Sequence, residues 1–166
     1  MRFLSIEKKI PAEIWLQAIT PLLREGYQFK ICPQGRSMVP FLQGGRDEAV
    51  LSAPDENYVY RKNDIVLFKS SNGIHVLHRI CSISKKGIYT LGDGNTAKEG
   101  PFQREDILAV ADYIIRKGKV LHNEDRTYIL LVGVWRAIRP FRPFLIKSYT
   151  ITKKLGQLLK KKNSTG

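Results

Sequence analysis

The residue of this sequence best placed to do chemistry is a serine in a short, turn-rich segment. Ser37 lies between Gly35 and Pro40; the glycine lets the backbone turn and the proline ends strand pairing, so the segment is predicted to be a loop. The amides of Ser37 and Met38 are then free to face a carbonyl oxygen, as an oxyanion site requires. Taken alone, such a segment is more often an ordinary turn, and a serine hydroxyl becomes a good nucleophile only when a base removes its proton.

A histidine in a strand-like segment is a candidate for that base. The alternation over residues 74–83 places His78 on an apolar face with Val76 and Ile80, and Arg79 on the opposite face. A histidine shielded from water suits the activation of serine, although a lone histidine on an apolar face is more often a core residue. We therefore treat His78 as the candidate general base.

An acid follows the next predicted strand. Asp93 lies in the segment Gly92-Asp93-Gly94-Asn95, where aspartate is favoured because it accepts hydrogen bonds from backbone amides. Its alternative role is to orient the histidine or to hold the serine loop.

Together these segments resemble the S24/S26 peptidase superfamily, which contains the type I signal peptidases and the self-cleaving repressors. The resemblance covers about residues 31–117: Ser37-Met38-Val39-Pro40 resembles the serine box, Asp64-Ile65-Val66-Leu67-Phe68 a buried strand motif, and Gly92-Asp93-Gly94-Asn95 the acidic box. A histidine followed by an arginine is typical of the archaeal, endoplasmic-reticulum and sporulation-type signal peptidases, and His78-Arg79 resembles that branch. The resemblance implies a Ser37/His78 catalytic pair.

Three features depart from that family. Gly35-Arg36 stands where signal peptidases usually have Ser-Gly, which removes a hydroxyl from the oxyanion site. Glu99 stands where the histidine branch has a further aspartate, so the third catalytic residue stays open between Asp93 and Glu99. Signal peptidases carry a transmembrane helix before the serine box, whereas residues 11–25 predict a short amphipathic helix containing proline.

The elements that must position these residues are predicted to be mainly β. Period-two alternation and turn signals predict a strand after Gly26 and further strands over 49–53, 64–69, 74–83, 88–91 and 107–116. With the resemblance, this gives a β core of the signal-peptidase and repressor-cleavage type, preceded by a helix and followed by a helical tail. The expected organisation is an N-terminal helix and lead-in (1–30), a peptidase domain (31–122) and a basic amphipathic tail (123–166).

The tail carries most of the charge. The net charge is +13, and residues 126–166 contain ten basic residues and no acidic one. An apolar stripe at Leu130, Leu131 and Val134 predicts an amphipathic helix, broken at Pro140 and Pro143 and resumed over 144–159. Two readings stay open: peripheral contact of the 126–162 tail with an anionic membrane, or packing of the stripe on the β core. Nucleic acid is not expected as a partner, because neither a helix-turn-helix nor an aromatic platform accompanies the charge.

No cofactor, metal site or disulfide is expected. Cys32 and Cys81 lack metal-ligand spacing, and their apolar neighbours predict buried free thiols. The first nine residues lack the apolar run of a signal peptide, and the longest apolar stretch, 128–135, is too short to span a bilayer. A cytoplasmic or membrane-peripheral protein is therefore expected.

The function predicted from these features is that of a serine endopeptidase. Ser37 would attack the scissile bond of a leader or precursor peptide, His78 would accept its proton, and the amides of Ser37 and Met38 would bind the oxyanion. Asp93 or Glu99 would orient the histidine. The alternatives are a non-catalytic module that binds peptide or membrane on the same fold, and a self-cleaving regulator.

Overall fold

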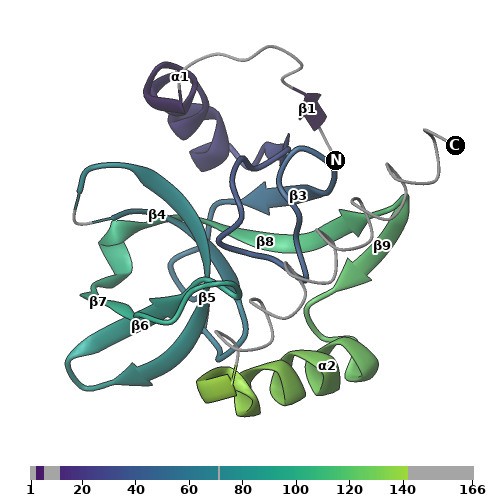
Figure 1. The fold of residues 1–166 in the computed structure, drawn as a ribbon. Coiled ribbons are helices and arrows are strands. Elements are labelled where there is room, and N and C mark those ends of the chain that lie inside the picture. The colour runs from purple at the N-terminus through teal and green to yellow at the C-terminus, as the bar shows by residue number, and fades with distance from the viewer. Residues whose placement is uncertain (1–2, 6–11, 71, 142–166) are drawn as a thin grey trace, which may run out of the picture. The chain divides into compact units, whose positions relative to one another are not determined.

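The alternating segments of the sequence form one continuous sheet. The computed structural model describes residues 3–5, 12–70 and 72–141. Within them the strands are β1 (Phe3–Ser5), β2 (Gln28–Ile31), β3 (Glu48–Ser52), β4 (Ile65–Lys69), β5 (His75–Ser84), β6 (Gly87–Leu91), β7 (Glu99–Phe102), β8 (Ile107–Arg116) and β9 (Lys119–His122). Their order is β1-β2-β3-β8-β4-β5-β6-β7 with β9 beside β8, and every pair except β1–β2 is antiparallel (Figure 1). The predicted mainly β class is confirmed.

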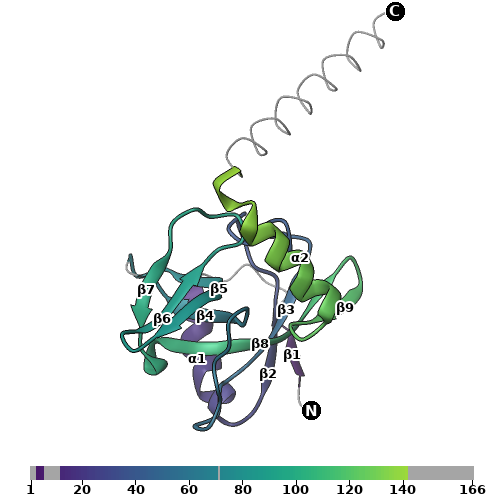
Figure 2. The same cartoon turned by 90° about the horizontal axis from the view of Figure 1, so that it is seen from below.

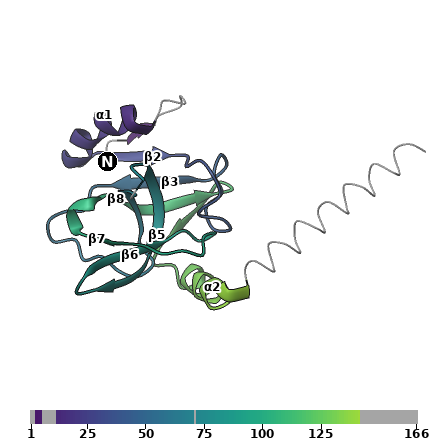
Figure 3. The same cartoon turned by 60° about the vertical axis from the view of Figure 1, so that its left-hand side comes forward.

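The N-terminal helix packs through one face. Helix α1 (Ala12–Arg24) buries Leu16, Ile19 and Leu23, which recur at helical spacing. Gly26, whose positive φ of 83° favours glycine, follows the end of the helix, and the amide of Tyr27 donates to the carbonyl of Leu22 over 3.1 Å. Figure 3 shows α1 lying beside β2.

Strand β5 separates two chemically different surroundings. His78 is paired in register with Val66 and lies on the same face as Ile80, as the alternation predicts. That face belongs to an apolar cluster of buried residues, with Val76 and Phe102 packed against it: Val66, Phe68, Ile80, Ile88, Ile107 and Val110. Arg79 points to the opposite face, so neighbouring residues of one strand lie in different surroundings.

Three strands, β1, β7 and β9, were not predicted from the sequence. Strand β7 contains Gly100 and Pro101, which are poor strand formers, and it is tolerated because it is the last strand on its side of the sheet. Strand β9 follows a tight turn in which Lys117 and Gly118 both have positive φ, 50° and 77°. The β8–β9 hairpin leads directly into the next helix (Figure 2).

That helix, α2 (Arg126–Ala137), begins the predicted tail. Its buried residues are Tyr128 and Val132, whereas Leu130 and Leu131 of the predicted stripe are 67% and 55% exposed. These two leucines therefore do not pack on the β core. A single 3-10 turn, η2 (Arg139–Phe141), follows at the predicted proline break, and a second short turn of this kind, η1 (Arg104–Asp106), precedes β8.

The chain divides into two compact units, residues 1–132 and 133–166. The first unit therefore reaches beyond residue 122, where the sequence-based peptidase domain ends, and includes the first half of α2. The predicted helix over 144–159 lies outside the described residues. In the part of the chain that the structure describes, no helix is long and apolar enough to cross a membrane.

Candidate active site

The serine loop, residues 32–47 between β2 and β3, is held by backbone hydrogen bonds and buried side chains. The amide of Val39 donates to the carbonyl of Arg36 over 3.2 Å, and the amides of Phe41 and Leu42 donate to the carbonyl of Met38 over 3.1 and 2.9 Å. The side chain of Met38 is 4% exposed and fixes the loop to the core. Ser37 therefore sits at the start of a tight turn, as its neighbours predict.

The amides around Ser37 remain available for a ligand. Among the residues that the structure describes, neither the Ser37 amide nor the Met38 amide donates a hydrogen bond, whereas the next amide, that of Val39, is occupied. Two adjacent free amides at the candidate nucleophile are the arrangement that an oxyanion site requires.

A buried carboxylate closes the far end of the serine loop. Asp47 is fully buried and accepts a hydrogen bond of 2.8 Å from the amide of Gln43 and a salt bridge of 2.6 Å from Arg46. Burial alone would raise the pKa of Asp47, but the hydrogen bonds from Arg46 and Gln43 outweigh it and lower the pKa. Asp47 thus stays charged and pins the loop where β3 begins.

The connection between β6 and β7, residues 92–98, contacts the serine loop backbone directly. The amide of Gly94 donates to the carbonyl of Ser37 over 2.7 Å. A Cβ atom at Gly92 would lie 2.6 Å from the same carbonyl oxygen, and a Cβ at Gly94 would lie 2.7 Å from the carbonyl oxygen of Arg36. Both glycines are therefore required by close approach of two backbones.

His78 lies buried beside Glu99. Its side chain is 3% exposed, and its Nδ1 atom lies 3.5 Å from Oε1 of Glu99, the first residue of β7. The ring of Phe68 meets the imidazole edge to face, with 5.8 Å between ring centroids. Burial lowers the pKa of His78, an effect opposed by the negative charges of Glu99 and Asp93. The imidazole is therefore neutral at pH 7 and able to accept a proton.

The ring geometry assigns different roles to the two nitrogens. With Nδ1 directed at Glu99, Nε2 points the other way and is the nitrogen left to act as a base. No hydrogen bond joins His78 to Ser37 within residues 3–5, 12–70 and 72–141. Catalytic hydrogen bonds of this kind are often formed only when substrate is bound.

The face around His78 is apolar except for a small polar patch. Thr90 of β6 is paired in register with Glu99, and its hydroxyl is fully buried. The Thr90 hydroxyl, Oε2 of Glu99 and Nδ1 of His78 make no hydrogen bond to another described residue. Buried polar atoms left in this state cost free energy, and a catalytic role is one of the explanations for them.

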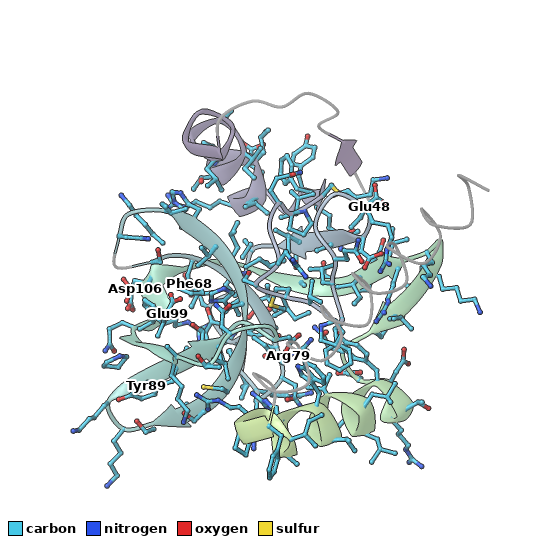
Figure 4. All side chains as sticks on the ribbon, in the orientation of Figure 1. Glu48, Phe68, Arg79, Tyr89, Glu99 and Asp106 are labelled. Atoms are coloured by element: carbon cyan, nitrogen blue, oxygen red, sulfur yellow. The ribbon has the colours of Figure 1, made fainter. Side chains whose placement is uncertain are left out.

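Asp93 does not face His78 but binds its neighbour Arg79. The two side chains are 1% and 3% exposed, and Arg79 donates to both carboxylate oxygens from Nε (3.0 and 3.2 Å) and to one from Nη2 (2.8 Å). Burial alone would lower the pKa of Arg79, but the charge of Asp93 raises it above its usual range. Figure 4 shows Glu99 beside Phe68, with Arg79 apart from them. Of the two acids that the sequence left open, Glu99 is the one beside the histidine.

Arg79 also binds two groups that the sequence did not predict. Its Nη1 donates to the carbonyl of Asn63 over 2.9 Å, and its Nη2 donates to the hydroxyl of Tyr128 over 2.7 Å. Tyr128 and Phe41 of the serine loop flank the guanidinium with their rings, 5.3 and 5.8 Å from Cζ. Nothing in the spacing of Tyr128 indicates this contact, because it joins segments far apart in the sequence.

The two cysteines take no part in the site. Cys32 is exposed and Cys81 is half-buried, so the prediction that both are buried is wrong, because the chain leaves β2 at Ile31 and Cys32 begins the serine loop. Among the described residues, no group of three or more His, Cys, Asp or Glu side chains is placed to hold a metal ion.

No protein-family model, curated protein or solved structure matches this chain. The interpretation of the site therefore depends on its residues and their geometry.

Proposed function

We propose that the protein is a serine endopeptidase similar to signal peptidase I, which cleaves a leader or precursor peptide with Ser37 and His78. Ser37 Oγ would attack the scissile carbonyl carbon while His78 Nε2 accepts its proton. The resulting oxyanion would be bound by the amides of Ser37 and Met38. The negative charge of Glu99, 3.5 Å from Nδ1, would stabilise the imidazolium that forms.

The reaction would then proceed through an acyl-enzyme. The imidazolium protonates the leaving amine as the carbon–nitrogen bond breaks, which leaves the acyl group on Ser37. Water attacks this ester, His78 accepts a proton from the water, and the protonated base returns that proton to Ser37 as the acid product leaves. The resemblance to signal peptidases favours small residues before the scissile bond.

One observation carries this proposal more than any other. The β6–β7 connection contacts the Ser37 carbonyl through Gly94 and ends at Glu99, whose carboxylate lies beside His78. A structural role for His78 would need neither a half-buried carboxylate at Nδ1 nor free amides at Ser37. The free amides at Ser37 and the carboxylate of Glu99 at His78 support a single site in which Ser37 is the nucleophile, His78 the base and Glu99 the orienting acid.

Covalent labelling tests the proposal. A fluorophosphonate probe should form an adduct on Ser37 of the wild-type protein, located by peptide mass mapping, and both Ser37→Ala and His78→Ala should abolish it. His75→Ala is the matched control, because His75 lies three positions earlier on the same strand and on its opposite face. Absence of an adduct in the wild type, together with no cleavage of a broad peptide library, would favour a non-catalytic binding module.

We also propose that the protein contacts an anionic membrane through α2 and the basic tail. Leu130 and Leu131 expose their side chains on α2, and residues 126–166 carry ten basic residues and no acidic one. A helix with exposed apolar residues and a surplus of positive charge fits the interface of an anionic bilayer.

Vesicle binding tests this partner. The protein should bind vesicles of phosphatidylcholine with 30% phosphatidylserine in 0.05 M salt, and bind poorly to phosphatidylcholine alone. The double variant Leu130→Ser/Leu131→Ser should bind several-fold more weakly. Ile83→Ser, which changes an exposed residue of β5, is the control. Equal binding of the double variant and the wild type would contradict the proposal.

A further inference from the structure

Tyr128 attaches the first half of α2 to the β core. Its side chain is 4% exposed, and that of Val132, one turn later, is fully buried. The three residues between them are all exposed: Ile129, Leu130 and Leu131. The contacts of Tyr128 are therefore specific to one face of the helix.

The hydroxyl of Tyr128 is one of the groups that bind the buried guanidinium of Arg79. It accepts a hydrogen bond of 2.7 Å from Nη2 of Arg79, which also binds Asp93. Burial raises the pKa of Tyr128, an effect that the charge of Arg79 opposes without reversing. The side chain is thus a neutral phenol, and its loss would leave Arg79 with one fewer acceptor in a site from which water is excluded.

The ring of Tyr128 contacts the serine loop directly. It meets the ring of Phe41 edge to face, with a centroid separation of 5.6 Å and an interplanar angle of 87°. The amide of Phe41 donates to the carbonyl of Met38, the residue whose own amide belongs to the proposed oxyanion site. A shift of the Phe41 ring is therefore transmitted to the turn that presents Ser37.

A second route leads from the Tyr128 hydroxyl to the same loop. Arg79 binds Asp93, and the next residue, Gly94, donates to the Ser37 carbonyl. The ring and the hydroxyl of Tyr128 thus reach the serine loop by two routes, the ring through Phe41 and the hydroxyl through Arg79, Asp93 and the β6–β7 connection.

From these contacts we infer that Tyr128 is a positioning residue for the serine loop, so that the beginning of the C-terminal tail is part of the active-site scaffold. Its relevance to cleavage depends on the proposed function. The positioning itself is a property of the folded protein and is measurable without a substrate.

Two variants separate the hydroxyl from the ring. Tyr128→Phe removes the acceptor for Arg79 and keeps the contact with Phe41, whereas Tyr128→Leu removes both. Tyr60→Phe is the matched control, because the hydroxyl of Tyr60 is also buried but makes no hydrogen bond to a described residue. Each variant is made in the full chain.

The measurement is hydrogen–deuterium exchange of residues 35–42 at pH 7, with the rate of fluorophosphonate labelling of Ser37 as a second readout. Tyr128→Phe should accelerate exchange in this segment and slow labelling by about 10-fold, the effect of losing one hydrogen bond to a charged group. Tyr128→Leu should have a larger effect and Tyr60→Phe none. Strand β4 should exchange as in the wild type, which separates positioning of the loop from global loss of stability.

The outcomes are distinguishable. Unchanged exchange of residues 35–42 in both Tyr128 variants would overturn the inference, whatever the labelling rates. Faster exchange in a protein that the probe never labels and that cleaves no peptide of a broad library would sustain the positioning role and refute the proposed protease. If Tyr128→Leu fails to fold, Tyr128→Phe still decides the result, since it deletes a single oxygen atom.

Discussion

The amide of Gly94 donates a hydrogen bond of 2.7 Å to the carbonyl of Ser37. This contact joins the loop that carries the candidate nucleophile to the connection that ends at Glu99, beside the candidate base. The segments that meet here are far apart in the sequence, so their association is a property of the fold.

Glu99→Gln should slow the labelling of Ser37 by between about 10²- and 10⁴-fold, because the neutral amide cannot stabilise the imidazolium. The negative charge of Glu99 raises the pKa of His78, so its removal should also move the acidic limb of the pH–rate profile to lower pH. Glu56→Gln, an exposed substitution, should leave both quantities unchanged. If Glu99→Gln is labelled at the wild-type rate with an unchanged pH–rate profile, this carboxylate has no role in orienting the base.

The pH dependence of the wild type should report His78 itself. Only the neutral imidazole accepts a proton, and burial lowers the pKa of His78 below the usual value of about 6.5. Labelling should therefore be above half of its maximum at pH 6.5 and reach half-maximum only at a lower pH, where the pH equals the lowered pKa. A profile that is already half-maximal above pH 7 would be inconsistent with His78 as the base.

Asp93→Asn should act on stability more than on orientation of the histidine. Removing one charge of a buried ion pair costs about 3–5 kcal/mol of unfolding free energy, and both Arg79 and Asp93 are buried. Urea denaturation is the measurement. Glu124→Gln, which breaks an exposed ion pair with Arg61, is the control and should change stability little, since solvent screens that pair.

Gly92→Ala should displace the serine loop. The added Cβ would lie 2.6 Å from the Ser37 carbonyl oxygen, so one of the two backbones must move, and labelling of Ser37 should fall at least about 10-fold. Gly133→Ala is the control, because no atom lies within 4 Å of a Cβ there, and alanine in a helix should add up to about 1 kcal/mol of stability. Equal labelling of wild type and Gly92→Ala would mean that the loop tolerates the shift.

The sequence predicts the local features of this site well. The alternation of β5 places His78 on the apolar face and Arg79 on the other, and Gly35 and Pro40 predict the loop at Ser37. The side-chain faces of β5 and the loop at Ser37 depend only on local backbone geometry, and the structure contains both of them. The class of the fold follows from the same alternation.

Long-range partners could not be predicted in this way. Both acids were candidates for the third catalytic residue, and only the register of β6 with β7 brings Glu99 to the histidine face. That register was hidden because β7 contains Gly100 and Pro101, which do not resemble a strand. The contact of Tyr128 with Arg79 was missed for a related reason. Helical periodicity shows only which residues of α2 share a face, and Arg79 lies on β5.

The β6–β7 connection also limits how this protein can be altered. It contacts the serine loop at Gly92 and Gly94 and reaches the histidine at Glu99, so its length sets the relative placement of both ends. An insertion anywhere between Gly94 and Glu99 would change two parts of the site at once. Variants designed to test the proposed activity should therefore leave the length of this segment unchanged.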